Sequence, residues 1–215
     1  MDKKMLDRTA AQAAQRAQQY WYTDGIAELV MGIFFALLGL YFGAQALLPE
    51  DSFLGNMLGP ILLLVIVGGG MAGRRLIGKL KERLTYPRTG YVAYRQPSGK
   101  RRWLTAALAF GMALLVSALF ARSPASQQWI PAISGLLIGA FWTYYAHRLE
   151  VVRLYVMAAI SVVTGAAITF AGMAESTGLP LYYLVMGVVL VISGGITLWI
   201  YLRRTRDLPR QEGRS

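Results

Sequence analysis

Residues 176–202 read STGLPLYYLVMGVVLVISGGITLWIYL, a run of 27 residues without a charge. A helix rises about 1.5 Å per residue, so about 20 residues cross a hydrocarbon core about 30 Å thick. Five further uncharged apolar stretches precede this one, at 29–48, 53–73, 103–121, 123–146 and 154–174. The sequence therefore predicts an all-α polytopic integral membrane protein, with six transmembrane helices in three in-out-in hairpins.

The predicted spans divide the chain into three parts. Residues 1–24 form a polar amino-terminal segment, residues 25–202 the membrane domain, and residues 203–215 a tail. Within the membrane domain we expect spans over about 25–48, 53–73, 103–121, 127–147, 154–174 and 178–202. A basic loop, residues 74–102, separates the second span from the third.

Basic residues are distributed unequally between the two sides of these spans. Of the 22 Lys and Arg residues, 21 lie in the two terminal segments, in the basic loop, or in the turn that holds Arg148 and Arg153. The opposite connections hold only Arg122. Because short loops rich in Lys and Arg stay in the cytoplasm, both termini are predicted to be cytoplasmic. We therefore expect a multi-pass protein of the plasma (inner) membrane.

Composition excludes several classes of site. The chain has no cysteine and a single histidine, so it offers no disulfide, no thiolate nucleophile and no His-rich metal site. Its net charge of +11 is explained by topology and by contact with anionic lipid rather than by nucleic acid. No ionisable residue lies at mid-depth in a predicted span, which opposes a proton-coupled pump and an intramembrane hydrolase. We expect no cofactor, no metal and no enzymatic activity.

The basic loop is the leading candidate for a functional surface. It holds ten basic residues against one acid, Glu82, and reads RRLIGKLKERLTYPRTGYVAYRQPSGKRR. Its first part predicts an amphipathic basic helix that either continues span two or lies along the membrane surface, and its last part predicts a short β-hairpin. We expect anionic phospholipid headgroups or a partner protein to bind through Arg74, Arg75, Lys79, Lys81, Arg83, Tyr86, Arg88, Tyr91, Arg95, Lys100, Arg101 and Arg102.

A second, weaker candidate is a polar cluster at the inner mouth of the bundle. Four residues fall at the predicted cytoplasmic ends of spans one, four and five: Glu28, His147, Arg148 and Glu150. A buried carboxylate beside a histidine is able to relay protons. The first turn of a helix stabilises a carboxylate by itself, however, so a capping role for Glu28 is the favoured interpretation.

Two alternative functions remain open at this stage. A transporter or channel for small solutes or ions, alone or as a homo-oligomer, would have a polar cavity lined by Asn56, Ser134 or Thr164. A headgroup-modifying enzyme would need Glu28, His147 and Glu150 to converge. The favoured function is a non-enzymatic membrane component that binds a partner protein or anionic lipid.

Pairs of glycines four residues apart predict close helix packing inside the chain. Such pairs let two backbones approach closely, where dispersion replaces the hydrophobic force that lipid removes. They occur at 39 and 43, 55 and 59, 69 and 73, and 135 and 139.

Overall fold

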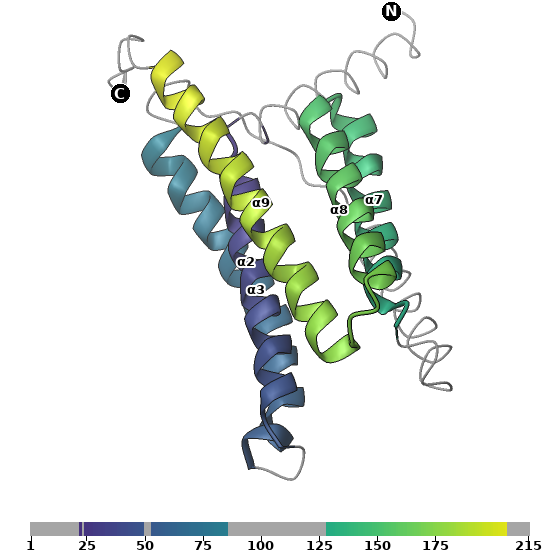
Figure 1. The fold of residues 1–215 in the computed structure, drawn as a ribbon. Coiled ribbons are helices and arrows are strands. Elements are labelled where there is room, and N and C mark those ends of the chain that lie inside the picture. Colours follow the sequence, from purple (N-terminus) through teal and green to yellow (C-terminus); the bar gives the residue numbers. More distant parts are fainter. Residues whose placement is uncertain (1–21, 23, 50–52, 86–127, 206–215) are drawn as a thin grey trace, which may run out of the picture.

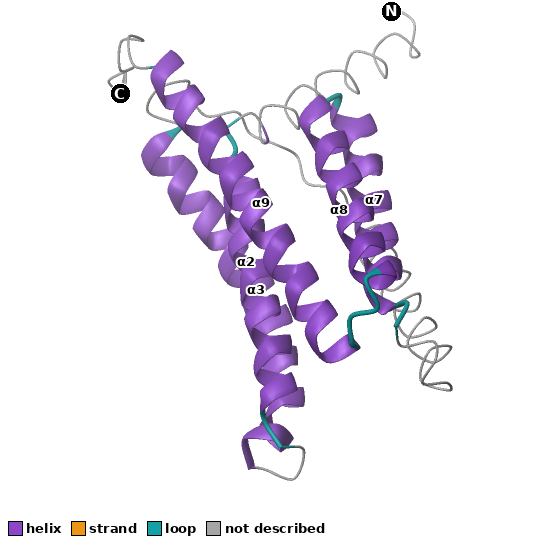
Figure 2. Cartoon of the chain, in the orientation of Figure 1, coloured by secondary structure: helices purple, strands orange, loops and turns teal. Residues whose placement is uncertain are grey.

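The computed structural model describes residues 22, 24–49, 53–85 and 128–205. They form five helices (Figure 1): α2 (Ile26–Leu47), α3 (Phe53–Leu84), α7 (Ile130–Leu149), α8 (Val152–Phe170) and α9 (Glu175–Arg204). No strand occurs within the described residues (Figure 2). The all-α prediction is confirmed for this part of the chain. The predicted span at 103–121 and the predicted β-hairpin of the basic loop lie outside it.

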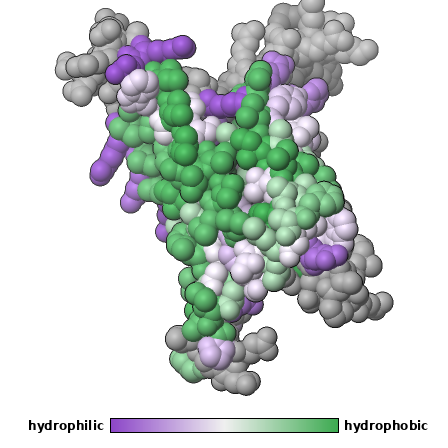
Figure 3. Space-filling model, in the orientation of Figure 1, coloured by the Kyte–Doolittle hydropathy of each residue, from purple (hydrophilic) through white to green (hydrophobic). Residues whose placement is uncertain are grey.

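Four of these helices contain segments long and apolar enough to cross a membrane: Ile26–Leu47, Pro60–Leu84, Val152–Phe170 and Ser176–Arg204. Large apolar side chains such as Leu64, Val163 and Ile192 are exposed on their outer faces. Hydrophobic residues cover much of the middle of the molecule, whereas hydrophilic residues gather mainly toward its upper end (Figure 3). An apolar surface of this extent is typical of a protein that lipid surrounds. These features indicate a multi-pass membrane protein.

The helices form two groups. We call α2, α3 and α9 the three-helix group, and α7 with α8 the helix pair (Figure 1). Helix α9 packs against α2 and also contacts both helices of the pair. Helices α2 and α8 begin at the same end of the molecule, where α3, α7 and α9 end; we call it the polar end.

Helices α2 and α9 run antiparallel with their backbones in close contact. A Cβ atom on Gly32 of α2 would lie 2.7 Å from the backbone nitrogen of Val191. On α9, a Cβ atom on Gly187 would lie 2.7 Å from the backbone nitrogen of Ala36. Distances this short leave no room for a side chain at either glycine. The close approach is possible only because glycines recur on the facing sides of both helices.

Glycine also determines the packing of the helix pair. A Cβ atom on Gly135 would lie 2.7 Å from the carbonyl oxygen of Ser161, and one on Gly139 would lie 2.6 Å from Cγ2 of Val162. The prediction that Gly135 and Gly139 mediate packing inside the chain is confirmed. Pro131 lies in the first turn of α7, where its missing N–H costs no helical hydrogen bond.

Helix α3 continues without a break from the apolar stretch into the basic loop. The structure therefore selects one of the two predicted alternatives, because the basic segment extends span two and is not a separate surface helix. Of the α3 side chains whose burial is described, only that of Lys81 is buried. A Cβ atom on Gly69 would meet the ring of Phe34 at 2.7 Å, so α3 packs against α2 chiefly along this narrow line.

Neighbouring glycines of α9 test the importance of the backbone contact. A Cβ atom on Gly194 would lie 2.6 Å from the backbone nitrogen of Leu29, whereas one on Gly195 would have no atom within 4 Å. Overpacking of this kind costs about 1–3 kcal/mol. Gly194→Ala is thus expected to lower the free energy of unfolding in detergent by that amount, and Gly195→Ala to leave it nearly unchanged. Equal effects of the two substitutions would contradict the α2–α9 packing described above.

Candidate functional site

Two buried ion pairs lie at the polar end, and the first joins α2 to α3. Asp24 lies two residues before the start of α2 and is 1% exposed, as is Lys81 of α3. The Lys81 ammonium lies 2.5 Å from Oδ2 of Asp24, and the Thr85 hydroxyl donates to the same oxygen at 3.2 Å. The backbone N–H of Ile26 donates to the other carboxylate oxygen at 3.2 Å. Asp24 thus joins the start of α2 to the end of α3.

This pair removes Lys81 from the predicted headgroup-binding set. A buried charge needs a partner and further hydrogen bonds to offset the loss of its hydration. Asp24 is this partner for Lys81, whose side chain is buried against α2 and not exposed on the surface of the protein. The sequence pattern could not distinguish it from its basic neighbours, because Asp24 lies 57 residues earlier in the chain.

The second ion pair joins the three-helix group to the helix pair. Glu28 of α2 is 1% exposed, and its Oε1 atom accepts a hydrogen bond from Nε of Arg153 at 2.7 Å. Its Oε2 atom accepts one from the Ser193 hydroxyl of α9 at 3.0 Å. Nη1 of Arg153 donates to the Thr197 hydroxyl at 3.4 Å, and Nη2 donates to the carbonyl oxygen of Tyr22. We call the three acceptors of the guanidinium, in Glu28, Thr197 and Tyr22, the Arg153 socket.

The favoured capping interpretation of Glu28 is therefore wrong. Glu28 lies in the first turn of α2, as predicted, but its carboxylate binds Arg153 and Ser193. The amino-terminal cap of α2 is Gly25, and the side chain that accepts a hydrogen bond from the first backbone N–H of this helix is that of Asp24, not Glu28. The sequence predicts Arg153 to lie in a cytoplasmic turn with Arg148 and indicates no partner for it. Only the packing of α8 beside α2 and α9 identifies this residue.

The other three members of the predicted inner-mouth cluster do not join Glu28. His147 is exposed near the end of α7. Arg148 is also exposed and donates to the Tyr144 hydroxyl at 3.4 Å on the same helix. Glu150 ends α7 with a left-handed backbone conformation, φ 54°. The convergence that a headgroup-modifying enzyme would need is not found among these residues.

Exposed basic side chains lie along the last turns of α3. Arg75, Lys79 and Arg83 are exposed and recur every four residues, so they line one face of the helix over about 12 Å. Arg74 is exposed as well. On the neighbouring end of α9, the guanidinium carbon of Arg203 lies 3.9 Å from the centroid of the Trp199 ring. We call Arg75, Lys79 and Arg83 the basic stripe.

Several predicted residues fall outside the described part of the chain. These are Tyr86, Arg88, Tyr91, Arg95, Lys100, Arg101 and Arg102. Of the residues named for a transport cavity, the Ser134 carbonyl lies 3.5 Å from the Tyr182 hydroxyl, and Thr164 is half-buried. The side chain of Asn56 is not described. Among the described residues, no three His, Cys, Asp or Glu side chains are grouped to hold a metal ion.

No protein-family model matches this chain, and neither a curated protein sequence nor a solved structure matches it significantly. Function is therefore inferred from the chain's own residues.

Neutralising Glu28 tests the second ion pair. In Glu28→Gln the Arg153 guanidinium keeps its charge and loses its counter-charge. Removing one member of a buried pair costs about 3–5 kcal/mol. Because Arg153 is 27% exposed, we expect the lower end, about 3 kcal/mol, in the free energy of unfolding in detergent.

The double variant Glu28→Gln with Arg153→Gln provides the control. It leaves no uncompensated charge, so it is expected to recover a substantial part of the lost stability. A loss below about 1 kcal/mol for Glu28→Gln alone is the result expected of a helix-dipole effect, and it would restore the capping interpretation.

Proposed function

We propose that this protein is a non-enzymatic component of the inner membrane that binds anionic phospholipid headgroups through the basic end of α3 and the rest of loop 74–102. It has six spans in three in-out-in hairpins, and both termini are cytoplasmic. The observation that carries the proposal is the basic stripe: three exposed basic side chains occupy one face of a helix that leaves the membrane at the polar end.

The positions of the described helix ends support the six-span arrangement. Helix α3 ends at the polar end, where Thr85 contacts Asp24. Helix α7 begins at the opposite end, where the Ala132 N–H donates to Thr169 near the end of α8. The intervening chain has to pass from one end of the bundle to the other. Its uncharged apolar stretch, 103–121, has the length of one crossing.

Charge supports the orientation. The polar end carries the basic stripe, Arg148, Arg153, Arg203 and Arg204, and the tail continues with further basic residues. Basic residues that flank spans are retained in the cytoplasm. The polar end is therefore assigned to the cytoplasmic side.

The contrast between Lys81 and the stripe supports a role in lipid binding. A basic residue that serves only topology needs no particular direction. Among the described basic residues of α3, Lys81 faces α2 and pairs with the Asp24 carboxylate. Arg75, Lys79 and Arg83 are exposed and point outward near the predicted end of span two. Cations in this position attract anionic headgroups and extend along their own stems to reach them.

Reporter fusions test the topology. Fusions after Asp51, Gln127 and Ser176 are expected to report an external position, and a fusion after Gly99 a cytoplasmic one, because successive spans alternate in direction. A cytoplasmic signal after Gln127 would remove the proposed crossing at 103–121.

Charge removal tests lipid binding. The variant with Arg75, Lys79 and Arg83 changed to Gln is reconstituted in mixed phosphatidylglycerol and phosphatidylethanolamine, re-extracted, and analysed by mass spectrometry of the retained lipid. We expect the ratio of anionic to zwitterionic lipid to fall relative to the unchanged protein, since each basic residue near the surface contributes to the attraction of anionic lipid.

A matched variant removes three charges elsewhere at the same end, with Arg148, Arg203 and Arg204 changed to Gln. The proposal requires a clearly smaller fall for this variant. Equal falls would assign lipid selectivity to net charge alone. An unchanged ratio in the stripe variant, together with loss of a co-purifying protein, would replace the lipid with a protein partner.

A further inference from the structure

The two helix groups are joined differently at their two ends. Opposite the polar end, a short connection of residues 171–174 links α8 to α9, and it contains Gly172 at φ 66° with no atom near its Cβ position. Gly178 packs closely there, since its Cβ atom would lie 2.8 Å from Cγ2 of Ile168. At the polar end, the hydrogen bonds of the Arg153 socket join the two groups.

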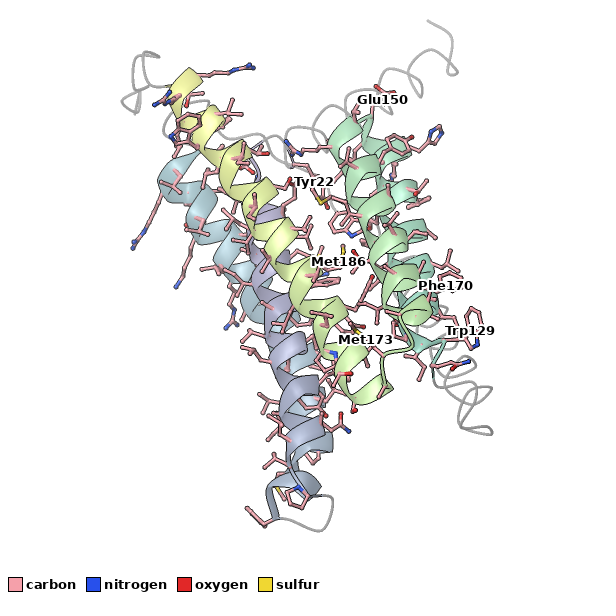
Figure 4. The ribbon with its side chains drawn as sticks, viewed as in Figure 1. Tyr22, Trp129, Glu150, Phe170, Met173 and Met186 are labelled. Atoms are coloured by element: carbon pink, nitrogen blue, oxygen red, sulfur yellow. The ribbon has the colours of Figure 1, made fainter. Side chains whose placement is uncertain are left out.

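Between these two ends, side chains rather than backbones make the contact. Backbone-to-backbone glycine contacts lie within the three-helix group and within the helix pair. The seam between the groups is filled by side chains such as Trp142, Met157 and Leu190, which share one cluster, and by Met186, which lies between the groups in Figure 4. Flexible methionine side chains adapt to changes in packing more readily than facing glycine backbones do.

One buried polar atom in the seam has no partner. Nε1 of Trp142 is the sole buried side-chain nitrogen or oxygen in the described residues that makes no hydrogen bond, although Trp142 is only 3% exposed. An unsatisfied buried donor costs about 1–3 kcal/mol. The unsatisfied Trp142 N–H therefore destabilises the packing of the seam.

A second polar contact between α8 and α9 lies closer to the connection than the Arg153 socket does. The hydroxyls of Ser161 on α8 and Tyr182 on α9 lie 2.8 Å apart, and Ser161 also donates to the Gly135 carbonyl at 3.0 Å. Tyr182 lies two turns from the start of α9 and Ser161 lies midway along α8, so this contact joins α8 to α9 between the connection and the Arg153 socket.

We infer that the helix pair is a movable unit, hinged at residues 171–174 and latched at the polar end by Arg153 in its socket. Release of the latch separates α8 from α9 at the polar end and gives the Trp142 N–H access to an acceptor. The packing of α2 against α9 is unaffected, because it depends on glycine contacts within the other group. This inference is independent of lipid binding by the basic stripe.

Spin labels can follow the seam directly. The chain has no cysteine, so two introduced cysteines give a single pair of labels. Val156 on α8 and Ile196 on α9 are both exposed near the polar end and report on the seam. Ile33 on α2 and Ile192 on α9 are exposed and report on the three-helix group. Distances are measured by double electron–electron resonance in nanodiscs of phosphatidylcholine.

Glu28→Gln is expected to widen the 156–196 distance distribution and to shift it toward longer distances, with the 33–192 distribution unchanged. Arg153→Lys, which keeps a charge beside Glu28 but lacks the guanidinium contacts to Thr197 and Tyr22, is expected to give a smaller change of the same kind. It serves as the test if Glu28→Gln does not fold.

Asp24→Asn is the matched control. It breaks the other buried ion pair of the polar end, which lies within the three-helix group, and it is expected to leave the 156–196 distribution unchanged. The latch is refuted if Glu28→Gln or Arg153→Lys leaves that distribution as in the unchanged protein. It is also refuted if Asp24→Asn widens it equally, or if both label pairs widen together.

Discussion

The close approach of α2 and α9 is the contact on which the rest of the arrangement depends. Lipid tails are as apolar as leucine side chains, so helices in a membrane associate through dispersion and hydrogen bonds at short range. Gly32, Gly187 and Gly194 bring the two backbones together where no side chain would fit. Helix α3 packs against α2, and the helix pair contacts α9 over most of its length and α2 through the ion pair of Arg153 with Glu28.

The polar end combines two kinds of charge that serve different purposes. Asp24 with Lys81 is a buried pair, and Glu28 with Arg153 is a pair of a buried carboxylate and a partly exposed guanidinium; each joins residues that are distant in the chain. Such pairs contribute little net free energy compared with apolar packing, but breaking one leaves an uncompensated charge, so they specify which helices meet. The residues of the basic stripe are exposed instead, and the proposed binding of anionic headgroups depends on them.

Helix contacts within the two groups are closer than the contacts between the groups. Facing glycines make α2 with α9, and α7 with α8, into closely packed units that cannot slide without backbone clashes. The seam between them contains adaptable side chains, one unsatisfied donor and a partly exposed arginine. Motion of the helix pair relative to α2 and α9 is therefore expected at this seam.

The sequence by itself determined the helical class, the approximate limits of α2, α7, α8 and α9, and the use of Gly135 and Gly139 for packing inside the chain. Apolar length and local glycine spacing act within one helix or between adjacent helices, so they can be read along the chain. It also identified the basic residues of α3 as a group. Only the tertiary structure decided that Lys81 faces Asp24 while its neighbours face outward, that Glu28 pairs with Arg153 rather than capping its helix, and that the first described helix packs on the last. Each of these contacts joins residues that are 57 to 165 positions apart in the chain. Charges this far apart pair only because the glycine-rich faces of the helices fit together in space, and no local sequence pattern encodes that fit.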